Sequence, residues 1–258
     1  MIKETEKFSE GTVFEGMVSI SAVINSPNSN DRKIQKIIYD ISKEKSKYKE
    51  LSFLRHKLKE LGFELVGVPS EEIDSVTIGN THGGIVAFCT ERTIPRLCNV
   101  SETLNKNGFY VMLEGIEDPY NFGYALRSLY AAGASGIILN ERNWMGAAGV
   151  ISRASAGASE MLDMFIASGE DAIKIFREHN FKIVCAGIRN SVSIYDADMK
   201  KPIFLIIGGE KRGISASVLS EADQIVRICY DSKFKGSLSA ASSATVIGFE
   251  IMRQNNNM

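Results

Sequence analysis

The sequence predicts an α/β protein whose main domain is built on a mostly parallel β-sheet covered by helices on both faces. Short apolar runs alternate with segments of helical length from residue 109 onwards, as expected of strands joined by helical crossovers. The runs at 204–207 and 225–229 are apolar throughout, which is typical of strands buried on both faces. Both runs lead into polar turns that contain glycine. Because ligands of open α/β sheets bind beyond the carboxyl ends of the strands, these turns are the first candidates for a site.

Length and charge limit the class of protein. The chain has 258 residues, of which 44% are hydrophobic, so it can bury a large core and form two domains. Its 30 basic and 31 acidic side chains leave a formal net charge of -1. A globally basic protein that binds polyanions over its whole surface is therefore excluded, and any surface for nucleic acid must be local.

The cysteines and the amino terminus indicate a cytoplasmic protein without a structural metal. The four cysteines are scattered, with no Cys-x-x-Cys pair and no histidine at ligand spacing, so we expect buried, reduced thiols. The first residues lack the apolar core of a signal peptide, and no run is long enough to span a bilayer. We expect neither a membrane nor a metal ion as a partner. The cysteines are Cys89, Cys98, Cys185 and Cys229.

The first domain is predicted over residues 1–95. Its elements are short helical or strand segments at 20–24 and 34–38, an amphipathic helix at 47–61, and strands at 63–68 and 84–88. Mixed elements of this size predict a small α/β accessory domain. A linker with a short helix follows over residues 96–108.

Basic side chains cluster between residues 32 and 59 of this first domain. One interpretation is the solvated face of a helix, and the other is a patch that follows the phosphates of RNA; the sequence leaves both open. His82 precedes the last strand of the domain without an acidic partner in the sequence, which favours a structural role. The basic residues are Arg32, Lys33, Lys36, Lys43, Lys45, Lys47, Lys49, Arg55, Lys57 and Lys59.

The second domain is predicted over residues 109–258. Strands are expected at 109–113, 136–139, 164–166, 181–186, 204–207 and 225–229, and helices at 122–132, 145–155, 171–179, 215–221 and 240–250. The last helix consists of small and apolar residues, which favours close packing against a neighbour. This domain contains the polar turns and is the candidate catalytic domain.

The glycine-rich turn after residues 204–207 first suggests phosphate binding. Gly208 and Gly213 have the outer spacing of a P-loop. However, Ile214 and Ser215 stand where a lysine and a serine or threonine are needed. No Gly-x-Gly-x-x-Gly follows the first strand of the domain. These residues therefore exclude the common nucleoside triphosphate and dinucleotide sites.

The turn after the first strand of the second domain carries a more specific pattern. Pro119 restricts the turn, and Asn121 is expected to cap the following helix by accepting a backbone N–H. Arg127 follows less than two helical turns later, so both side chains can face one end of the sheet. Taken alone, the two residues also fit a helix cap and a surface charge.

Three motifs in order resemble those of the SpoU/TrmH family of RNA ribose 2′-O-methyltransferases, within the SPOUT class. The first is Asp-Pro-x-Asn-x-Gly-x-x-x-Arg at 118–127, and the second is Ile-Ile-Gly-Gly-Glu-x-x-Gly at 206–213. The third is Ile228 followed by Ser237 and Leu238. The stretch at 153–160 is similar to the segment that the family carries between its first two motifs. The similarity covers residues 111–253, and residues 16–88 more weakly resemble the small RNA-binding domain that many members carry in front.

The resemblance implies a C-terminal trefoil knot, a homodimer, S-adenosylmethionine as the methyl donor and ribosomal or transfer RNA as the substrate. Small and apolar residues suit an adenine ring, which needs apolar walls and exposed backbone groups. By position in the motifs, the cofactor would be enclosed by Gly187, Ile207, Gly208, Gly209, Ile228, Ser237 and Leu238. The catalytic residues that the resemblance implies are Asn121, Arg127, Glu210 and Ser239.

Arg127 matches the catalytic arginine of the family. Transfer requires a ribose 2′-hydroxyl to attack, in line, a methyl group on a sulfonium, so positioning in a dry site matters more than a strong acid. Since arginine stays protonated in proteins, it is a poor base. We expect Arg127 to hold a substrate phosphate and to favour the ionised hydroxyl through its charge. Asn121 and Glu210 would hold Arg127 and the turn in place.

The third motif departs from the family pattern. Cys229 stands where the family usually has proline, and Ser239 where it has asparagine. Three hypotheses therefore remain. The first is an RNA 2′-O-methyltransferase, the second is an RNA-binding protein of the same fold with impaired catalysis, and the third is a methyltransferase that acts on a base or a small molecule.

Overall fold

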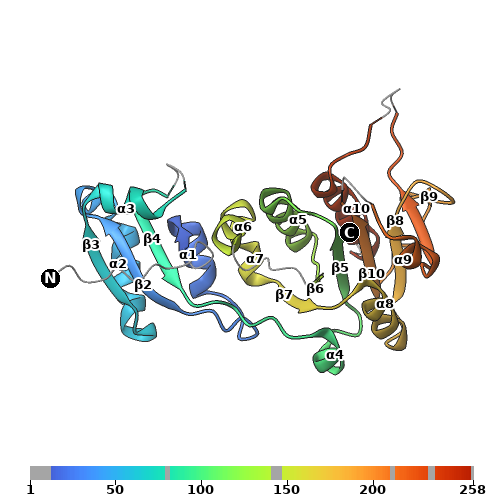
Figure 1. Cartoon of the computed structure of the whole chain (residues 1–258), viewed down its shortest axis with the longest axis horizontal. Helices are drawn as coiled ribbons and strands as arrows, with labels where there is room; N and C mark the ends of the chain where they lie inside the picture. Colours follow the sequence, from blue (N-terminus) through green and yellow to red (C-terminus); the bar gives the residue numbers. More distant parts are fainter. Residues whose placement is uncertain (1–12, 79–81, 141–146, 210–212, 232–235, 257–258) are drawn as a thin grey trace. The chain divides into compact units, whose positions relative to one another are not determined.

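The computed structural model describes residues 13–78, 82–140, 147–209, 213–231 and 236–256. The chain divides into two compact units, whose elements are labelled in Figure 1. Unit 1 comprises Met1–Thr93 and Asn143–Met161, and unit 2 comprises Ile94–Arg142 and Leu162–Met258. The chain therefore passes from unit 1 to unit 2, returns to unit 1 and ends in unit 2. The predicted roles of residues 1–95, 96–108 and 109–258 as RNA-binding domain, linker and catalytic domain stay predictions.

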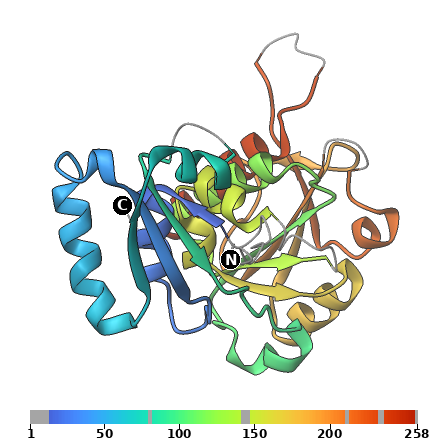
Figure 2. The same ribbon diagram turned by 60° about the vertical axis from the view of Figure 1, so that its left-hand side comes forward.

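Unit 1 contains a four-stranded mixed sheet in the order β1-β4-β2-β3 (Figure 2). β2 and β3 run parallel, and β4 runs antiparallel to both β1 and β2. The segment at 20–24 is helical and the one at 34–38 is a strand, which settles two elements that the sequence left open. The strands are β1 (Val13–Glu15), β2 (Ile34–Asp40), β3 (Glu64–Val68) and β4 (Ile85–Cys89). The helices are α1 (Gly16–Ile24), η2 (Ile41–Lys43), α2 (Tyr48–Leu61), α3 (Ser70–Val76), α6 (Ala148–Ala154) and α7 (Ala158–Met161).

The two faces of this sheet carry separate apolar clusters, because successive side chains of a strand point to opposite faces. One cluster joins Phe14 and Ile37 of the sheet to Leu54 of α2 and Ala148 of α6. The other packs Ile73 of α3 against the opposite face. Helix α6 is therefore part of the core of unit 1, although it lies far from the amino-terminal elements in the chain.

A buried polar network connects the amino-terminal part of unit 1 to α7. The Arg32 Nε donates to Glu160 Oε2 at 3.0 Å, and the Asn30 amide donates to the same oxygen at 2.9 Å. Arg32 also donates to the Thr90 carbonyl at 2.8 Å, and its guanidinium lies 4.9 Å from the centre of the Phe14 ring. Since Arg32 is 6% exposed, it does not belong to any exposed basic surface.

The contacts of His82 fit the structural role that the sequence favours, but the expectation that it lacks an acidic partner is wrong, because Asp74 lies beside it. Its Nδ1 accepts the Gly84 N–H at 3.1 Å, so the proton of a neutral ring lies on Nε2. Nε2 in turn lies 3.4 Å from the carboxylate of Asp74. The ring is buried and fixes the turn that leads into β4.

Unit 2 is built on a seven-stranded sheet in the order β7-β6-β5-β10-β8-β11-β9, and every neighbouring pair is parallel. This confirms the predicted α/β fold with a mostly parallel sheet. The first strands are β5 (Phe109–Glu114), β6 (Gly136–Leu139), β7 (Asp163–Ile166) and β8 (Lys182–Ala186). The remaining strands are β9 (Val192–Ser193), β10 (Ile203–Gly208) and β11 (Gln224–Arg227).

Helices cover both faces of this sheet. Tyr110 and Phe204 form one apolar cluster with Phe176 of α8, Val218 of α9 and Leu97 of α4. Alternate residues of β5 and β10 point to the opposite face, where α5 and α10 pack against each other (Figure 1). The helices are α4 (Leu97–Val100), η3 (Ser101–Thr103), α5 (Pro119–Ala131), α8 (Gly169–Glu178), α9 (Ala216–Ser220) and α10 (Ala240–Asn255).

The structure differs from the sequence-based expectations in several places. The predicted strand at 225–229 ends at Arg227, and the short elements β1, α3 and β9 were not predicted. The expectation of buried thiols is wrong for Cys98 in α4 and for Cys229 beyond the end of β11, which are both exposed. The trefoil knot stays a prediction. Of the helices in the described residues, none is long and apolar enough to cross a bilayer.

Candidate functional site

The carboxyl ends of four neighbouring strands bring the three motifs to one edge of unit 2. β5 pairs with β10, β10 with β8, and β8 with β11, all in parallel. Neighbouring strands are about 5 Å apart, so the ends of β10 and β11 lie within about 10 Å of each other. Along this edge lie, in order, the first motif, the second motif, Gly187 and the start of the third motif.

Gly208 and Gly209 are required by the packing of two turns. The Gly209 N–H donates to the Glu114 carbonyl at 2.5 Å, at the end of β5. A Cβ on Gly209 would lie 2.5 Å from the Gly115 carbonyl carbon, and one on Gly208 would lie 2.5 Å from that of Gly213. Both contacts are with backbone, which cannot rotate away. Gly209 therefore holds the second motif directly against the turn that begins the first, and Gly208 allows the backbone of the second motif to approach Gly213.

The first motif forms the amino-terminal end of α5. Asp118 Oδ1 accepts the backbone N–H groups of Tyr120 and Asn121 at 2.7 and 2.9 Å, so Asp118 is the cap. The prediction that Asn121 caps this helix is therefore wrong. Pro119 occupies the first helical position, where its missing N–H costs nothing, and this places Asp118 at the cap. Asn121 lies in the first turn and is partly buried, and its side chain is not used for capping.

Arg127 is exposed on α5, and Tyr124 beside it is 51% exposed. Within the described part of the chain, the Arg127 guanidinium makes no hydrogen bond or ion pair. Helical side chains tilt toward the helix amino terminus, so this long side chain can reach back toward the motif turns. The position suits a cation that binds a ligand at this edge.

Helix α10 begins at the same edge as α5. Ser239 caps it by accepting a backbone N–H at 3.1 Å. Thr245 donates to the Ser128 hydroxyl at 2.7 Å, and one turn further a Cβ on Gly248 would lie 3.3 Å from that of Ala132. The two helices therefore run in the same direction, with Ser239 and the first motif at their corresponding ends.

The ends of β8 and β11 present an apolar surface. The Gly187 N–H donates to the Val226 carbonyl at 2.9 Å, which holds the turn after β8 beside β11. Ile188 is 82% exposed and Tyr230 is 40% exposed. Ile228 is partly exposed near them. An adenine ring needs apolar walls with backbone groups close by, so these residues fit an adenosine-containing cofactor.

Tyr230 joins the two described parts of the third motif. Its hydroxyl accepts the Leu238 backbone N–H at 3.1 Å, so the segments before and after 232–235 lie side by side. Sequence reasoning missed Tyr230, although an aromatic residue directly after Ile228 and Cys229 of the third motif is a usable signal. Ser237 is exposed, and Ile207 is buried within β10. The predicted site residue Glu210 lies outside the described residues.

Glu114 is an acidic group held in an unusual environment at this edge. Its Oε2 is buried and makes no hydrogen bond within the described residues. Burial raises the pKa of Glu114, and the charge of Glu170 raises it further. Burial also raises the pKa of the Cys185 thiol to about 12, so this cysteine is a neutral thiol. Sequence reasoning missed Glu114 because a single acid after an apolar strand is a common pattern.

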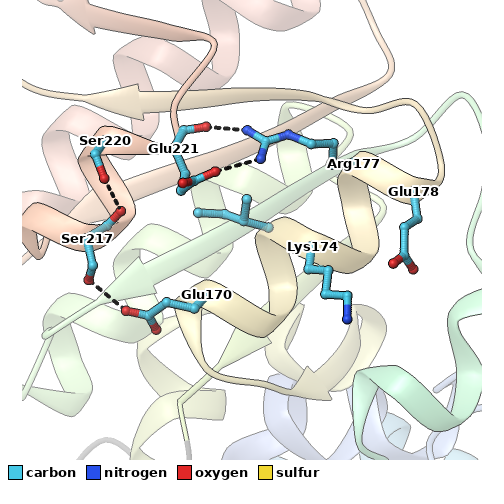
Figure 3. A pocket seen from close by; sticks show the side chains of 8 residues that line it. Glu170, Lys174, Arg177, Glu178, Ser217, Ser220 and Glu221 are labelled. Carbon is cyan, nitrogen blue, oxygen red and sulfur yellow. Dashed lines mark hydrogen bonds and ion pairs between the residues drawn. The ribbon is translucent and has the colours of Figure 1, made fainter.

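A separate groove lies between α8 and α9 (Figure 3). Arg177 donates to the Glu221 carboxylate at 2.7 Å, and Ser217 donates to Glu170 at 2.7 Å, so much of its polar surface is paired. None of the predicted site residues lines it. The groove has a volume of about 630 Å³ and is lined by Glu170, Ile173, Lys174, Arg177, Glu178, Ser217, Ser220 and Glu221. In the described residues, no three histidine, cysteine or acidic side chains come together as a metal-ligand set.

The structure is that of an α/β protein in which three sequence motifs meet at the carboxyl edge of a parallel sheet. The model of the SpoU rRNA Methylase family matches residues 108–249, which is more than half of the chain. The protein belongs to this family.

Several known proteins are similar to this chain over most of its length. The 23S rRNA (guanosine-2′-O-)-methyltransferase RlmB of Shewanella oneidensis is 28% identical over 210 residues, covering 79% of this chain and 84% of the relative. RlmB of Xylella fastidiosa is 23% identical over 242 residues, which cover 92% of this chain and 96% of the relative. The AdoMet-bound rRNA methyltransferase of Sinorhizobium meliloti matches with a TM-score of 0.75 and 25% identity, over 95% of this chain and 88% of that one.

Proposed function

We propose that the protein transfers a methyl group from S-adenosylmethionine to a ribose 2′-hydroxyl of structured ribosomal or transfer RNA. Its family and the names of the RlmB relatives, which are guanosine 2′-O-methyltransferases of 23S rRNA, support this reaction. The observation that carries the proposal is the meeting of the three motifs at one sheet edge, where Gly208 and Gly209 of the second motif leave no room for a Cβ.

The cofactor would be held by the turns after β8, β10 and β11. Bound S-adenosylmethionine supplies a methyl group on a sulfonium. The glycines would contact it through backbone groups, and Ile228 and Leu238 through apolar contact. We add Ile188 and Tyr230, because both are exposed beside these turns. The proposed set is Gly187, Ile188, Ile207, Gly208, Gly209, Ile228, Tyr230, Ser237 and Leu238.

Arg127 would bind a phosphate of the substrate RNA and stabilise the ionised 2′-hydroxyl. A guanidinium keeps its charge and donates two parallel hydrogen bonds to a phosphate, which fixes the attacking oxygen as well as attracting it. The proton would leave to phosphate or water. Asn121, in the first turn of α5, and Glu210 would position Arg127 and the second-motif turn. Ser239 would act mainly by fixing the start of α10, since its hydroxyl caps that helix.

Impaired catalysis, the alternative suggested by Cys229 and Ser239, gains no support from the described residues. Serine keeps the cap of α10 that an asparagine would also provide, because both residue types accept a backbone N–H there. Methyl transfer to a base or a small molecule is likewise favoured by no specific feature.

The test combines cofactor binding with mapping of the methyl group. Calorimetry should detect S-adenosylmethionine binding to the purified protein. Incubation of RNA from a deletion strain with labelled cofactor should label one ribosomal or transfer RNA. Nuclease digestion and mass spectrometry should then find the label on a ribose. Label on a base would overturn the ribose assignment, and tight RNA binding without cofactor binding would overturn the enzyme.

The proposal includes a homodimer. Tyr124 and Tyr130 of α5 and Phe249 of α10 are 51%, 44% and 40% exposed, and burial between two copies would remove this apolar surface from water. Light scattering after gel filtration should therefore give twice the mass of 28.4 kDa. A monomer at micromolar concentration would contradict this part. The proposal also includes a C-terminal trefoil knot in the chain and a cytoplasmic location of the protein.

RNA binding by unit 1 is the remaining part of the proposal. Lys45, Lys49 and Lys59 are exposed and make no ion pair within the described residues, so they can contact phosphates. Other members of the basic cluster are paired with acids and contribute less positive potential. These pairs are Lys43 with Asp40, Lys47 with Glu50, Arg55 with Glu44, and Lys57 with Glu60.

A further inference from the structure

An exposed aromatic side chain lies at the start of α5. Tyr120 is the second residue of this helix and is 40% exposed. Its backbone is fixed, because Pro119 occupies the first helical position and the Tyr120 N–H donates to Asp118 Oδ1 at 2.7 Å. Since helical side chains tilt toward the helix amino terminus, the ring projects over the turn between β5 and α5. Tyr120 therefore carries its ring on a fixed backbone at the sheet edge where the three motifs meet.

Tyr120 and Arg127 share one exposed face of α5. They are seven residues apart, which is about 20° short of two full turns. They are separated by about 10 Å along the helix axis, and the long side chain of Arg127 tilts back toward Tyr120. Tyr124, which the proposed dimer would bury, lies about 40° from Tyr120 in the opposite direction round the helix. This direction leads toward Ser128, which contacts Thr245 of α10.

A ring and a guanidinium on one helix face suit a single unpaired nucleotide. Proteins recognise RNA mostly at unpaired nucleotides, whose bases are splayed out and stack on aromatic rings. In the proposed reaction, Arg127 binds a phosphate next to the reacting ribose. The base of that nucleotide lies within reach of Tyr120, which is about two turns closer to the amino end of α5. A base stacked on the ring would orient the ribose between two fixed points, and this would set the direction of its 2′-hydroxyl.

We propose that Tyr120 binds, by stacking, the base of the nucleotide whose ribose is methylated. This inference rests on the proposed function, since it takes RNA as the substrate and Arg127 as the ligand of its phosphate. It narrows the substrate class to a nucleotide that is unpaired in the complex, in a loop or a bulge. Because every base has a π-face, the contact accepts all four bases.

The first test measures the binding of a synthetic RNA that spans the ribose mapped in the labelling experiment. Tyr120→Ala should weaken RNA binding by about 5- to 100-fold, the range expected for the loss of one base–aromatic stack. Tyr120→Phe and Tyr120→Trp should stay within about threefold of wild type, because both keep a π-face. Tyr120→Leu is apolar without a π-face and should bind at least about threefold more weakly than wild type. All four variants should bind S-adenosylmethionine within about twofold of wild type.

A second RNA, which lacks only the base of the methylated nucleotide, tests whether Tyr120 contacts that base. Removal of the base should weaken binding to wild type by about fivefold or more. The loss should be less than about twofold in Tyr120→Ala, where the contact is already absent. Removal of a base from a nucleotide further along the RNA should weaken binding equally in both proteins. A merely structural role of Tyr120 would make the two losses equal for the methylated nucleotide as well.

Salt dependence separates the ring from the guanidinium. Stacking releases no counterions, so the slope of log K against log salt should be unchanged in Tyr120→Ala, whereas Arg127→Ala should reduce it by about one.

Tyr195→Ala is the matched control for loss of an exposed ring. Tyr195 is 60% exposed and follows β9, which lies four strand positions, or about 19 Å, from β5 in the sheet. This variant should change neither the RNA affinity nor the effect of removing the base.

Four outcomes would overturn the inference. The first is wild-type RNA affinity in Tyr120→Ala, and the second is an equal effect of removing the base in wild type and in Tyr120→Ala. The third is RNA binding as tight in Tyr120→Leu as in Tyr120→Phe. The fourth is a monomeric Tyr120→Ala where wild type is a dimer, which would place the ring in the contact between subunits.

If Tyr120→Ala does not fold, the same comparisons with Tyr120→Leu decide the question. A wild-type protein that labels no RNA would refute the proposed function. Labelling by wild type together with full RNA affinity in the Tyr120 variants would refute the inference alone.

Discussion

Arg127 combines a positive charge with exposure on α5, whose first turn lies at the end of the sheet where the three motifs meet. We predict that Arg127→Ala lowers kcat by about 100-fold or more, because a preorganised charge near a developing oxyanion contributes on that scale. The affinity for S-adenosylmethionine should stay within about twofold, since the guanidinium is assigned to the RNA. Initial rates and calorimetry measure the two effects separately.

The matched comparison for Arg127 is Arg127→Lys, which keeps the charge and loses the planar fork. The kcat of Arg127→Lys should lie between that of wild type and that of Arg127→Ala. Lys174→Ala, which removes an exposed cation from α8, should leave the rate unchanged. Full activity in Arg127→Ala would remove the residue from the mechanism.

Glu250 of α10 is a buried carboxylate whose ionised form is stabilised. Arg253 donates to it at 2.7 and 2.8 Å, and Gln254 donates at 2.7 Å. These hydrogen bonds, that of Arg253 most strongly, lower the pKa of Glu250. A lowered pKa stabilises the folded state above the unfolded value of about 4.3, and the contribution is lost as the pH falls through the folded pKa.

We therefore predict that Glu250→Gln lowers the free energy of unfolding by about 1–3 kcal/mol at pH 7, as expected for hydrogen bonds to a charged group. The difference from wild type should shrink as the pH falls below about 4. Urea denaturation at several pH values measures it, with Glu178→Gln as the exposed control. A difference that is constant down to pH 3.5 would contradict the prediction.

The sequence predicted the secondary structure around the motifs better than the individual contacts of their residues. The motif spacing placed Asn121 at the start of the helix that carries Arg127, and Asn121 lies in the first turn of that helix. It did not show that Asp118 caps this helix, although aspartate before proline is a recognisable start signal. It also did not reveal that the Glu114 carbonyl accepts the Gly209 N–H, because that contact depends on the pairing of β5 with β10, which are far apart in the chain.

At the scale of elements, the turns after β5 and β10 pack backbone to backbone. We predict that Gly209→Ala destabilises the protein by about 1–3 kcal/mol, since its Cβ would overlap the Gly115 carbonyl group and neither backbone can yield locally. Cofactor binding should weaken at the same time. Thermal denaturation and calorimetry measure the two effects.

Gly248→Ala in α10 is the control for this substitution. Its Cβ would lie 3.3 Å from side-chain atoms of Ala132 and Leu129, a tight but adjustable contact, and alanine favours the helix. The net change should be within about 1 kcal/mol. Equal losses of stability in Gly209→Ala and Gly248→Ala would contradict the prediction that the backbone packing of the turns requires glycine at position 209.

The long strands and helices were predictable because their apolar patterns are local. The runs at 109–113 and 204–207 became the central strands β5 and β10, and the small-residue segment at 240–250 became α10. The missed strands β1 and β9 have three and two residues, too few to show a period, and they form only by pairing with distant strands. Tertiary pairing, which a local pattern does not contain, decides such elements.

At the scale of the whole molecule, the buried ion pair of Arg32 and Glu160 joins two distant parts of the chain. Their side chains are each 3% exposed. We predict that Glu160→Ala lowers the free energy of unfolding by about 3–5 kcal/mol, because it leaves the Arg32 charge buried and unpaired. Chemical denaturation followed by circular dichroism measures this loss.

Glu44→Ala is the matched control, since it breaks a carboxylate–arginine pair, with Arg55, that is about half exposed. Its effect should be much smaller, because water replaces an exposed partner. Similar losses in the two variants would contradict the importance of burial. The sequence did not indicate the Arg32–Glu160 contact, because the residues are 128 positions apart and each alone reads as a surface charge.

The return of the chain to unit 1 at residues 143–161 bears on how such a protein can evolve. Recombination between related genes exchanges contiguous stretches, and a crossover near residue 93 would import a new amino-terminal module. The imported module would have to pack against α6 and α7, which evolved together with the original amino-terminal module. Glu160 would then contact the residue that replaced Arg32. The gene segments that encode residues 1–93 and 143–161 are therefore expected to be inherited together. Hybrid genes that give a folded protein should carry both segments from the same parent.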